Sequence, residues 1–369
     1  MNVLAIFGTR PEAIKMAPVV LALLADDRFE VKVCVTAQHR EMLDQVLDFF
    51  QITPDYDLAI MEPGQQLEEL TARMLLALKP VLKREKTDWV LVHGDTTTCF
   101  VAALAAFYQQ IKVAHVEAGL RTHDLYSPFP EEANRQLVSL LAALHLAPTQ
   151  QAAENLYREG KPQGRVVVTG NTVVDALFLG LDRIEEDFVE LESFKDFLDP
   201  DKKLILVTGH RRENFGKPQQ EVLESLKVLA DRPDTQLIFP VHLNPMVQHP
   251  VEELLGNHKH ILLCDPVPYE VFLWLMKRSH LIITDSGGIQ EEAPSLKKPV
   301  LVTRSVTERK EALESGAVQL VGTDQQAIVQ SAKRLLEDPI YYAKITEHPN
   351  PYGDGQAAKR ILNALLDFE

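Results

Sequence analysis

The sequence predicts an α/β protein built from two doubly wound parallel sheets. Short β-branched runs alternate with helix-length amphipathic segments along the chain. These short runs are continuously apolar, which is typical of parallel strands covered by helices on both faces. They fall into two series of about six runs, separated by a charged stretch. At 369 residues the chain is also longer than a single hydrophobic core usually accommodates, so two domains are expected.

Each predicted strand is a short apolar run that ends at a polar or glycine-bearing junction. The first series is Val3–Phe7, Val31–Val35, Trp89–His93, Val113–Val116, Leu144–Ala147 and Val166–Val168. The second series is Leu204–Thr208, Leu237–Pro240, Ile261–Leu263, Leu281–Thr284, Pro299–Val302 and Val318–Leu320. Between them, the charged segment 181–203 carries Pro200 and suits a helix and a loop. A dense turn cluster at 350–355 precedes a final amphipathic helix, Gln356 to Leu366.

Composition argues against several classes of protein. The net charge is −15 with acids and bases interspersed, which disfavours nucleic acid or an anionic membrane as the main partner. No apolar stretch is long enough to cross a bilayer, and the first residues lack a basic leader. Cys34, Cys99 and Cys264 are far apart and indicate reduced core residues, and no CxxC or HExxH metal pattern occurs. We therefore expect a cytoplasmic protein without a metal site.

The run DSGGIQEE at 285–292 is the most informative stretch. It follows an apolar strand and opens a helix, with Ser286 as the N-cap and Gly287 and Gly288 allowing close approach to the exposed amides. Free N–H groups at a helix start favour a phosphate, and Glu291 or Glu292 could hold the hydroxyls of a ribose. The alternative is a plain glycine turn with acids that complement the helix dipole.

Two junctions of the first half could carry charged chemistry, because ligands of open parallel sheets bind beyond the carboxyl ends of the strands. Arg10, in the turn after the first strand, suits a diphosphate, or it is a surface arginine paired with Glu12 or Asp95. Asp95 follows the strand Trp89–His93 and is either a helix N-cap or a carboxylate that exchanges protons with a ligand.

Two further carboxylates of the first half have the same ambiguity. Glu117 ends a strand, where burying a charged group costs free energy, which favours a functional role. Alternatively, Arg121 is its structural partner. Glu131 lies in a proline-bounded loop that enters a helix. Glu131 and Arg135 stand four residues apart, so an ordinary helix ion pair competes with a catalytic role.

In the second half, His210 follows the first strand of its series and could contact a phosphate or a leaving group. His93, His115 and His242 also lie at strand ends, and most of these are expected to be satisfied structural histidines. No GxGxxG follows a strand and no GxxxxGK[ST] occurs, which disfavours dehydrogenases and P-loop kinases.

Together these segments resemble the bacterial non-hydrolysing UDP-N-acetylglucosamine 2-epimerases. The matching stretches, in order, are FGTRPEAIKMAP from Phe7, TAQHREMLDQVL from Thr36, VLVHGDTTT from Val90, HVEAGLRT from His115, YSPFPEEANRQ from Tyr126, VTGNTVVDAL from Val168, TGHRREN from Thr208, PVHLNP from Pro240, TDSGGIQEEAPSL from Thr284 and NPYGDG from Asn350. The match covers nearly the whole chain.

The resemblance implies a GT-B type fold, two Rossmann-like domains with an interdomain cleft. The implied domains are 1–169, carrying the acid–base residues, and 170–354, binding UDP, with a C-terminal helix in 355–369 that crosses back onto the first. By resemblance the catalytic residues are Asp95, Glu117, Glu131 and His210. The implied substrate-binding residues are Arg10, Lys15, Arg135, His210, Ser286, Gly287, Gly288, Glu292 and Arg309. The resemblance also implies a homodimer and a product used in surface polysaccharide synthesis, and it requires no cofactor or metal.

The implied reaction interconverts UDP-N-acetylglucosamine and UDP-N-acetylmannosamine. No carbonyl acidifies the hydrogen on carbon 2, so the family expels UDP to give a 2-acetamidoglucal and then adds UDP back. Cationic groups stabilise the departing diphosphate, and carboxylates stabilise positive charge at the anomeric carbon. Acid–base groups must reach both faces of the sugar ring.

The sequence departs from the family at four positions. Lys297 and His123 stand where glycine is usual, Val306 stands for a threonine, and Lys310 stands for a proline. The last two lie in the loop around Arg309, on the UDP side. Some family members are activated by a second UDP-N-acetylglucosamine. Gln38, His39 and His242 lie in motifs linked to that allosteric site, although the loop at 62–66 lacks an arginine that some members have.

Three other functions compete with this interpretation. A hydrolysing epimerase would release UDP and free N-acetylmannosamine. A GT-B glycosyltransferase would share the fold and the UDP grip but would need an acceptor. A nucleotide-sugar sensor would bind without turnover, although the concentration of carboxylates at strand ends argues against it.

Overall fold

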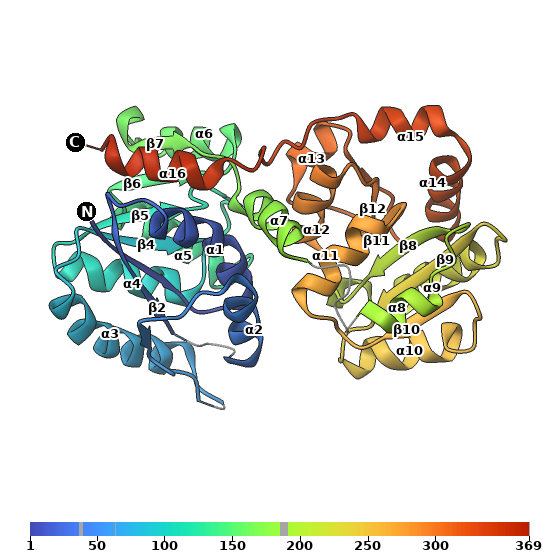
Figure 1. The fold of residues 1–369 in the computed structure, drawn as a ribbon, viewed down its shortest axis with the longest axis horizontal. Helices are drawn as coiled ribbons and strands as arrows, with labels where there is room; N and C mark the ends of the chain where they lie inside the picture. The colour runs from blue at the N-terminus through green and yellow to red at the C-terminus, as the bar shows by residue number, and fades with distance from the viewer. Residues whose placement is uncertain (37–39, 63, 185–190, 369) are drawn as a thin grey trace. The chain divides into compact units, whose positions relative to one another are not determined.

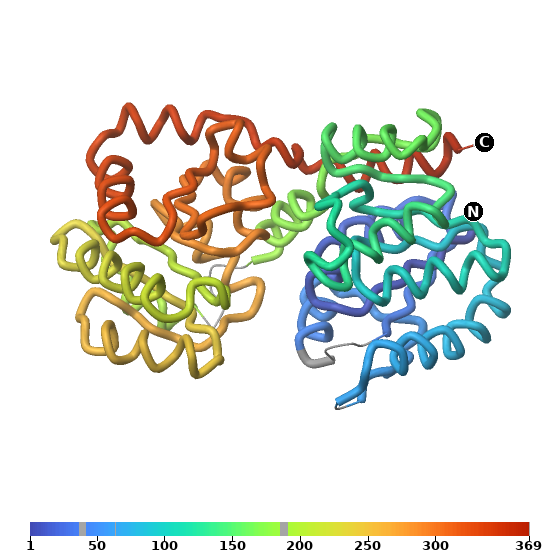
Figure 2. The backbone as a smooth tube through the Cα atoms, turned by 180° about the vertical axis from the view of Figure 1, so that it is seen from behind, coloured from blue at the N-terminus to red at the C-terminus, as the bar shows by residue number. Residues whose placement is uncertain are grey.

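The computed structural model describes residues 1–36, 40–62, 64–184 and 191–368, which form two compact units (Figure 1). Unit 1 comprises Met1–Leu179 and Gly353–Glu369, and unit 2 comprises Gly180–Tyr352. The chain therefore passes between the units twice. Figure 2 shows from behind that the last helix belongs to the same unit as the N-terminal strand.

Unit 1 is built on a seven-stranded sheet in the order β3-β2-β1-β4-β5-β6-β7, and all its pairings are parallel. Its strands are β1 Asn2–Phe7, β2 Glu30–Val35, β3 Tyr56–Asp57, β4 Trp89–His93, β5 Lys112–Val116, β6 Leu144–Ala147 and β7 Val166–Val168. Its helices are α1 Arg10–Leu24, α2 Arg40–Phe50, α3 Leu67–Arg84, α4 Thr97–Tyr108, α5 Glu131–Leu141, α6 Gln150–Arg158, the 3₁₀ turn η1 Gln163–Arg165, and α16 Ala357–Leu366. Helix α7, Thr172–Arg183, begins in unit 1 and ends in unit 2.

Unit 2 repeats the design with a six-stranded parallel sheet in the order β10-β9-β8-β11-β12-β13. Its strands are β8 Lys203–Thr208, β9 Thr235–Pro240, β10 Ile261–Cys264, β11 Leu281–Thr284, β12 Val300–Val302 and β13 Val318–Leu320. Its helices are α8 Glu192–Phe197, η3 Arg212–Asn214, α9 Lys217–Ala230, α10 Pro245–Leu255, α11 Tyr269–Arg278, α12 Gly287–Glu292, η4 Ala293–Leu296, α13 Lys310–Glu314, α14 Gln325–Glu337 and α15 Pro339–Thr346.

Both sheets are doubly wound, as the continuous apolar runs predicted. In unit 1, helices α3, α4 and α5 pack side by side on one face of the sheet, and α2, α1 and α16 pack together as a second group. Strand β4 is buried along its whole length, which explains why Val90, Leu91 and Val92 do not alternate with polar residues. The twelve predicted strands are all present. The two-residue edge strand β3 was not predicted, because it is very short and Asp57 separates Tyr56 from the apolar residues that follow.

The strand orders place one switch point in each sheet. In unit 1 the order reverses between β1 and β4, and in unit 2 it reverses between β8 and β11. Crevices at such points, beyond the carboxyl ends of the strands, are where doubly wound sheets bind ligands. The turns containing Arg10 and Asp95 follow the first pair of strands. The turns containing His210 and Ser286 follow the second pair.

The C-terminal helix is tied to unit 1 by buried contacts. Asp175 of α7 accepts hydrogen bonds from the backbone N–H groups of Ala357 (3.2 Å) and Ala358 (2.8 Å), so it caps α16 from 182 residues away. Phe368 packs edge-on against Trp89 with ring centroids 4.9 Å apart. These contacts keep the start of α7 in unit 1. The boundaries therefore fall at 179/180 and 352/353, whereas the sequence analysis expected 169/170 and 354/355.

Within the described residues, no helix is long and apolar enough to span a membrane. Cys34 and Cys99 are buried thiols and Cys264 is partly buried, and none of the three forms a disulfide.

Candidate active site

The turn after β1 is organised by a buried glutamate. Glu12 Oε2 accepts hydrogen bonds from the N–H groups of Gly8 (3.0 Å) and Thr9 (2.8 Å), and its Oε1 accepts one from the hydroxyl of Thr96 (2.6 Å). Thr9 and Glu12 form a capping box at the start of α1. Burial outweighs these hydrogen bonds and raises the pKa of Glu12. Glu12 thus joins the turn that carries Arg10 to the turn after β4.

Asp95 is held by Arg135 rather than standing alone. The Arg135 guanidinium approaches Asp95 Oδ2 through Nε (2.9 Å) and Nη2 (2.6 Å), and Asn134 donates to the Asp95 carbonyl (2.9 Å). Arg135 Nη1 also contacts Glu132 at 3.2 Å. Of the two alternatives for Glu131 and Arg135, the helix ion pair is not the one observed: the guanidinium contacts Asp95, 40 residues away in sequence. Thr96, not Asp95, is the N-cap of α4.

The two glutamates at the start of α5 have different surroundings. Glu132 is fully buried and accepts hydrogen bonds from the N–H groups of Thr122 (3.0 Å) and His123 (3.2 Å) and from Gln136 (2.9 Å). Although burial opposes it, these bonds keep the pKa of Glu132 below its ordinary value. Glu131 Oε2 is buried and has no hydrogen-bond partner among the described residues. Glu132 therefore shapes the loop, whereas the buried oxygen of Glu131 is not used to hold it.

Glu117 lies at the end of β5 with φ of 61°, a left-handed conformation that costs a residue with a side chain about 1–2 kcal/mol. Its Oε2 accepts a hydrogen bond from the Lys15 ammonium and another from Asn171 (3.1 Å), and His93 Nε2 lies 3.8 Å away. The structural partner expected from the sequence, Arg121, pairs instead with Glu159 (2.6 Å) and is a loop anchor. Strain at Glu117, held by buried partners, is typical of a functional position.

Of the strand-end histidines that the sequence singled out, His115 is structural. His115 is fully buried, and its Nε2 is 2.7 Å from the carbonyl of Gly94. Burial lowers the pKa of His115 to about 3, so the ring is neutral and donates to that carbonyl. His145, its neighbour on β6, has a pKa lowered to about 4 for the same reason.

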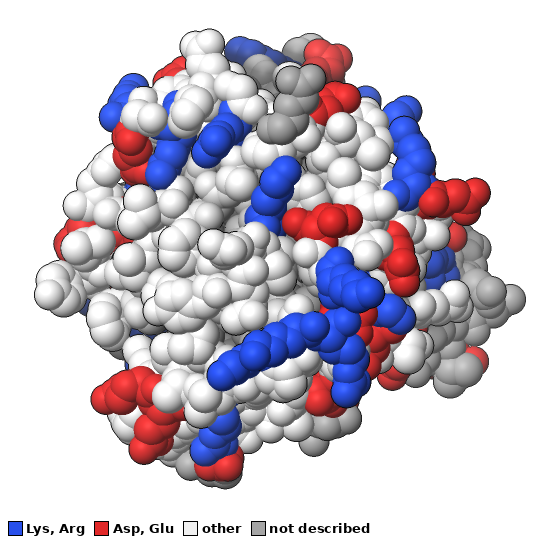
Figure 3. Space-filling view, turned by 90° about the vertical axis from the view of Figure 1, so that its left-hand side faces the viewer, with Lys and Arg blue, Asp and Glu red and all other residues white. Residues whose placement is uncertain are grey.

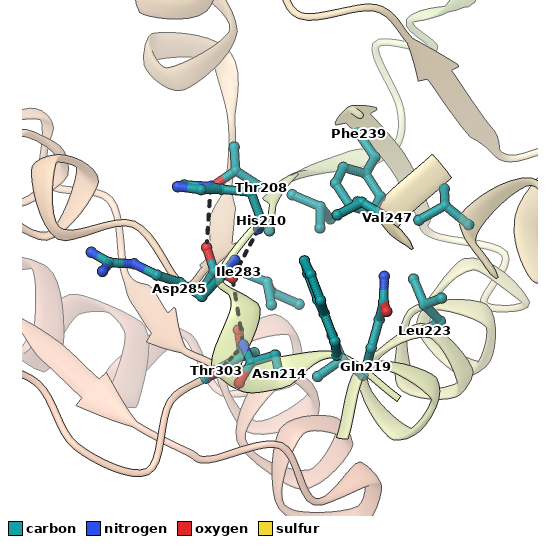
Figure 4. A pocket seen from close by; sticks show the side chains of 16 residues that line it. Thr208, His210, Asn214, Gln219, Leu223, Phe239, Val247, Ile283, Asp285 and Thr303 are labelled. Atoms are coloured by element: carbon teal, nitrogen blue, oxygen red, sulfur yellow. Dashed lines mark hydrogen bonds and ion pairs between the residues drawn. The ribbon is translucent and has the colours of Figure 1, made fainter. Parts of the chain in front are cut away.

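The corresponding turns of unit 2 are organised by Asp285. Its Oδ2 accepts hydrogen bonds from the N–H groups of His210 (2.9 Å) and Arg211 (2.8 Å) and lies 3.4 Å from Asn214 Nδ2, while its Oδ1 is 3.5 Å from His210 Nδ1 (Figure 4). The His210 ring stacks on His242 with centroids 5.5 Å apart. Burial lowers the pKa of His210, and Asp285 opposes that shift.

Below the His210 loop lies a cavity of about 40 Å³ between the sheet and helices α9 and α10. Figure 4 shows Phe239, Val247, Leu223 and Ile283 on its apolar side and Asp285 and Asn214 on its polar side. The polar rim thus belongs to the same hydrogen bonds that hold the loop.

The DSGGIQEE stretch begins α12 as expected. Ser286 occupies the N-cap position, although its side chain makes no capping hydrogen bond. Of the two glutamates, Glu291 pairs with Arg309 (2.8 Å), and Glu292 accepts a hydrogen bond from the Tyr269 hydroxyl at 3.2 Å. A side chain on Gly287 would come within 3.0 Å of the Arg309 guanidinium, so glycine allows the loop to pack there.

The loop that departs from the family is a chain of ion pairs. Arg309 also pairs with Glu308 (2.7 Å), which pairs with Arg304 (2.8 Å), which pairs with Glu213 (2.7 Å). Val306, one of the departures, is exposed and takes no part in these ion pairs, and Lys310 is the first residue of α13.

The structure groups the predicted residues by unit. Unit 1 carries Arg10, Lys15, Asp95, Glu117, Glu131 and Arg135, and unit 2 carries His210, His242, Ser286, Gly287, Gly288, Glu292 and Arg309. Gln38 and His39 lie outside the described residues. Sequence reasoning did not single out Asn171, Glu132 or Asp285, whose side chains make hydrogen bonds within these turns. The capping box T-x-x-E at Thr9 was the available signal for Glu12. Across the described ranges, no group of three His, Cys, Asp or Glu side chains could hold a metal ion.

A family model described as UDP-N-acetylglucosamine 2-epimerase matches residues 21–366. The chain belongs to the UDP-N-acetylglucosamine 2-epimerase family. The UDP-N-acetylglucosamine 2-epimerase of Escherichia coli strain K12 is 58% identical over 369 residues, covering 99% of this chain and 98% of the relative. This confirms the resemblance that the motifs indicated.

Solved structures agree with this membership. The crystal structure of UDP-GlcNAc 2-epimerase from Neisseria meningitidis bound to UDP-GlcNAc matches with a TM-score of 0.90 at 51% identity, covering 99% of this chain and 100% of that chain. The glycosyltransferase of kitacinnamycin matches at 13% identity with a TM-score of 0.67, covering 98% of each chain. That likeness concerns the fold alone, and the predicted two-domain, Rossmann-like GT-B type is confirmed. Epimerases of this family are isomerases.

Proposed function

We propose that this chain interconverts UDP-N-acetylglucosamine and UDP-N-acetylmannosamine by inverting carbon 2 of the sugar. The observation that carries the proposal is the 58% identity, over almost the full length of both chains, to a relative named for this activity. The solved relative from Neisseria meningitidis was bound to UDP-GlcNAc, which supports the same substrate.

The reaction we infer proceeds by elimination and re-addition. The bond between the anomeric carbon and the UDP oxygen breaks, a base removes the proton from carbon 2, and a double bond forms between these carbons. UDP then adds back to the anomeric carbon while an acid delivers a proton to the opposite face of carbon 2. The electron pair of the carbon–oxygen bond leaves with UDP and that of the carbon–hydrogen bond forms the double bond, so the step needs neither oxidant nor reductant.

In this proposal unit 2 holds UDP. The amides at Gly287 and Gly288 receive a phosphate, Glu292 binds the ribose hydroxyls, and His210 stabilises the departing diphosphate. The His210 pKa is lowered by burial, and an approaching diphosphate would raise it again, so the ring gains its charge when the leaving group needs it.

Unit 1 supplies the acid–base groups. Glu117, with Lys15 and Asn171 donating to one of its oxygens, is suited to accept a proton. Asp95 and Glu131 would serve two further purposes. They would exchange a proton on the opposite face of the sugar ring and stabilise the positive charge that develops at the anomeric carbon. The two contacts from the Arg135 guanidinium orient the Asp95 carboxylate.

Turnover in D2O without an acceptor tests the proposal. We expect solvent deuterium at carbon 2 of both nucleotide sugars and no free sugar in the proton NMR spectrum. Stoichiometric N-acetylmannosamine and UDP would instead indicate the hydrolysing reaction, and an undeuterated carbon 2 would indicate a glycosyltransferase or a sensor. Asp95→Asn, Glu117→Gln and Glu131→Gln should each lose turnover by about 10²-fold or more while UDP binding persists.

We also propose that the chain forms a homodimer through the outer face of α3, α4 and α5. Five large apolar side chains are exposed on these adjacent helices: Leu76 (70%), Phe107 (55%), Tyr108 (61%), Leu137 (43%) and Leu140 (73%). Figure 3 views the side of unit 1 and shows a broad area without charged side chains. Such a patch on a chain of net charge −15 favours a second copy over a charged partner.

Light scattering after size exclusion tests the interface. The wild-type chain should have twice the mass of one chain, and Leu140→Lys should shift it to the single-chain mass. Ile340→Lys, at an isolated exposed position of unit 2 (83%), is the matched control and should leave the mass unchanged. A Leu140→Lys chain of unaltered mass would refute this interface.

A further inference from the structure

The carboxylate of Glu117 is held from three elements. Lys15 reaches it from α1, His93 lies 3.8 Å from it on β4, and Asn171 donates to it from the residue before α7. Lys15 and His93 are titratable groups that face this carboxylate from the elements packed against it. Asn171 is a neutral donor. The proposed reaction uses it only as a hydrogen-bond donor to one oxygen of Glu117.

The orientation of the Asn171 amide is determined by the backbone. Its side-chain oxygen accepts the N–H of Val173 (3.0 Å), which makes Asn171 the N-terminal cap of α7. The amide nitrogen must therefore point the other way, and it donates to Glu117 Oε2 at 3.1 Å. Asn171 is only 4% exposed, so water does not compete for either contact.

The same residue lies where the chain re-enters unit 1. Gly353, the first residue after the second crossing, has φ of 147°, and a side chain there would lie 3.6 Å from the Asn171 backbone nitrogen. Helix α7, which Asn171 caps, carries the first crossing. The residue that donates to Glu117 therefore begins the helix that carries the first crossing and lies next to Gly353, which follows the second.

We propose that Asn171 is a positioning residue that fixes the plane and the ionised form of the Glu117 carboxylate. This inference rests on the function proposed above, in which Glu117 exchanges a proton with carbon 2. Two donors on one oxygen favour the charged carboxylate and block its rotation. A base that rotates or moves by about 1 Å loses rate by about 10²-fold, so the contact matters although Asn171 does not touch the reacting atoms.

Asn171→Asp isolates this role, because aspartate has the same shape and still accepts the Val173 N–H. The cap of α7 is kept, the donor to Glu117 is lost, and two carboxylates are brought together. We expect kcat to fall by about 10²-fold with KM changed less than about threefold. The acid limb of the pH–rate profile should move upward by about one unit, because a neighbouring carboxylate disfavours ionisation.

The matched control is Asn363→Asp, the same change at an exposed position on α16, which should leave kcat and the pH profile unaltered. A purely structural role for Asn171 would lower stability and activity together without moving the acid limb, and that result would overturn the proposal. Wild-type kcat with an unmoved acid limb would overturn it as well.

A double-mutant cycle of unfolding stability tests the contact between Asn171 and Glu117 independently of catalytic activity. In the Glu117→Gln background the repulsion disappears, since the glutamine amide can donate to the carboxylate that Asn171→Asp introduces. Asn171→Asp should therefore lower the urea midpoint of unit 1 clearly more in the wild-type background than in Glu117→Gln. Equal shifts would overturn the positioning role. If Glu117→Gln itself turned over normally, the proposed function would fail while a non-zero coupling would still establish the contact.

Discussion

Removing the buried carboxylate of Glu12 should destabilise unit 1 more than any surface change, whereas replacing it by an amide should not. Glu12→Ala leaves the N–H groups of Gly8 and Thr9 and the hydroxyl of Thr96 without their acceptor. Each buried group left unpaired costs about 1–3 kcal/mol, and because the groups on Thr9 and Thr96 are only partly buried we expect a total at the lower end, about 3–5 kcal/mol. That is a large share of the roughly 5–15 kcal/mol that stabilises a folded protein.

Glu12→Gln can replace all three hydrogen bonds. Its carbonyl oxygen accepts from Gly8 and Thr9, and its amide donates to the Thr96 oxygen, whose hydroxyl can rotate. The expected loss at neutral pH is below about 1 kcal/mol. Because burial raises the pKa of Glu12, the folded state binds its proton more tightly than the unfolded chain does. The stability from this group is complete below the unfolded pKa and is lost as pH rises through the folded pKa. The stability of Glu12→Gln relative to wild type should therefore improve as pH rises through that window.

The two tryptophans make the assay specific for one unit. Trp89 lies in unit 1 and Trp274 in unit 2, and they are the two tryptophans of the chain. In a Trp274→Phe background, urea unfolding followed by the fluorescence of Trp89 reports unit 1 alone. The reasoning is refuted if Glu12→Ala costs less than about 1 kcal/mol, or if Glu12→Gln is as damaging as Glu12→Ala.

Three other predictions concern stability. Lys297 is exposed and holds φ of 55°, so Lys297→Gly should raise the stability of unit 2 by roughly 0.5–1 kcal/mol, measured by the fluorescence of Trp274; a loss would contradict the strain. His115, with its pKa lowered to about 3 by burial, stabilises the fold above its unfolded pKa and loses that contribution as pH falls. At about pH 4.5 the loss is about 2–3 kcal/mol, and His115→Gln should show a smaller drop between neutral and acid urea midpoints. Arg309→Gln leaves the buried carboxylate of Glu291 without this partner and should cost unit 2 roughly 3 kcal/mol, unlike Lys217→Gln, which removes an exposed ion pair of the same unit.

The strands were predictable because burial on both faces leaves a direct signal in the sequence. Trp89–His93 and Leu281–Thr284 were predicted with the observed bounds. A short, uninterrupted apolar run is typical of a parallel strand that is buried on both faces. The edge strand Tyr56–Asp57 has one neighbouring strand and only two residues, one of them charged, so the strand itself is not an apolar run.

Partner choice inside the candidate site was less predictable. Local spacing suggested Arg135 for Glu131 and Arg121 for Glu117, but each guanidinium pairs with a carboxylate about 40 residues away in sequence. Such pairings depend on which strand ends are neighbours in the sheet, and spacing along one helix does not encode that. The positive φ of Glu117 has no sequence signal either, because glutamate rarely adopts it.

Both units hold the turn after their first strand in the same way. In unit 1, Glu12 Oε2 accepts two successive backbone N–H groups, and in unit 2, Asp285 Oδ2 accepts those of His210 and Arg211. The two carboxylates come from different elements, α1 in one case and the end of β11 in the other, so a shared local motif does not explain the likeness. What the two turns share is their place beside a switch point, where the backbone must project beyond the sheet without a neighbouring strand to pair with. A buried carboxylate replaces the missing strand as the acceptor. The side chains of Arg10 and His210 are then carried by backbone that is held in place, and in the function we propose such preorganisation would favour stabilisation of a leaving group.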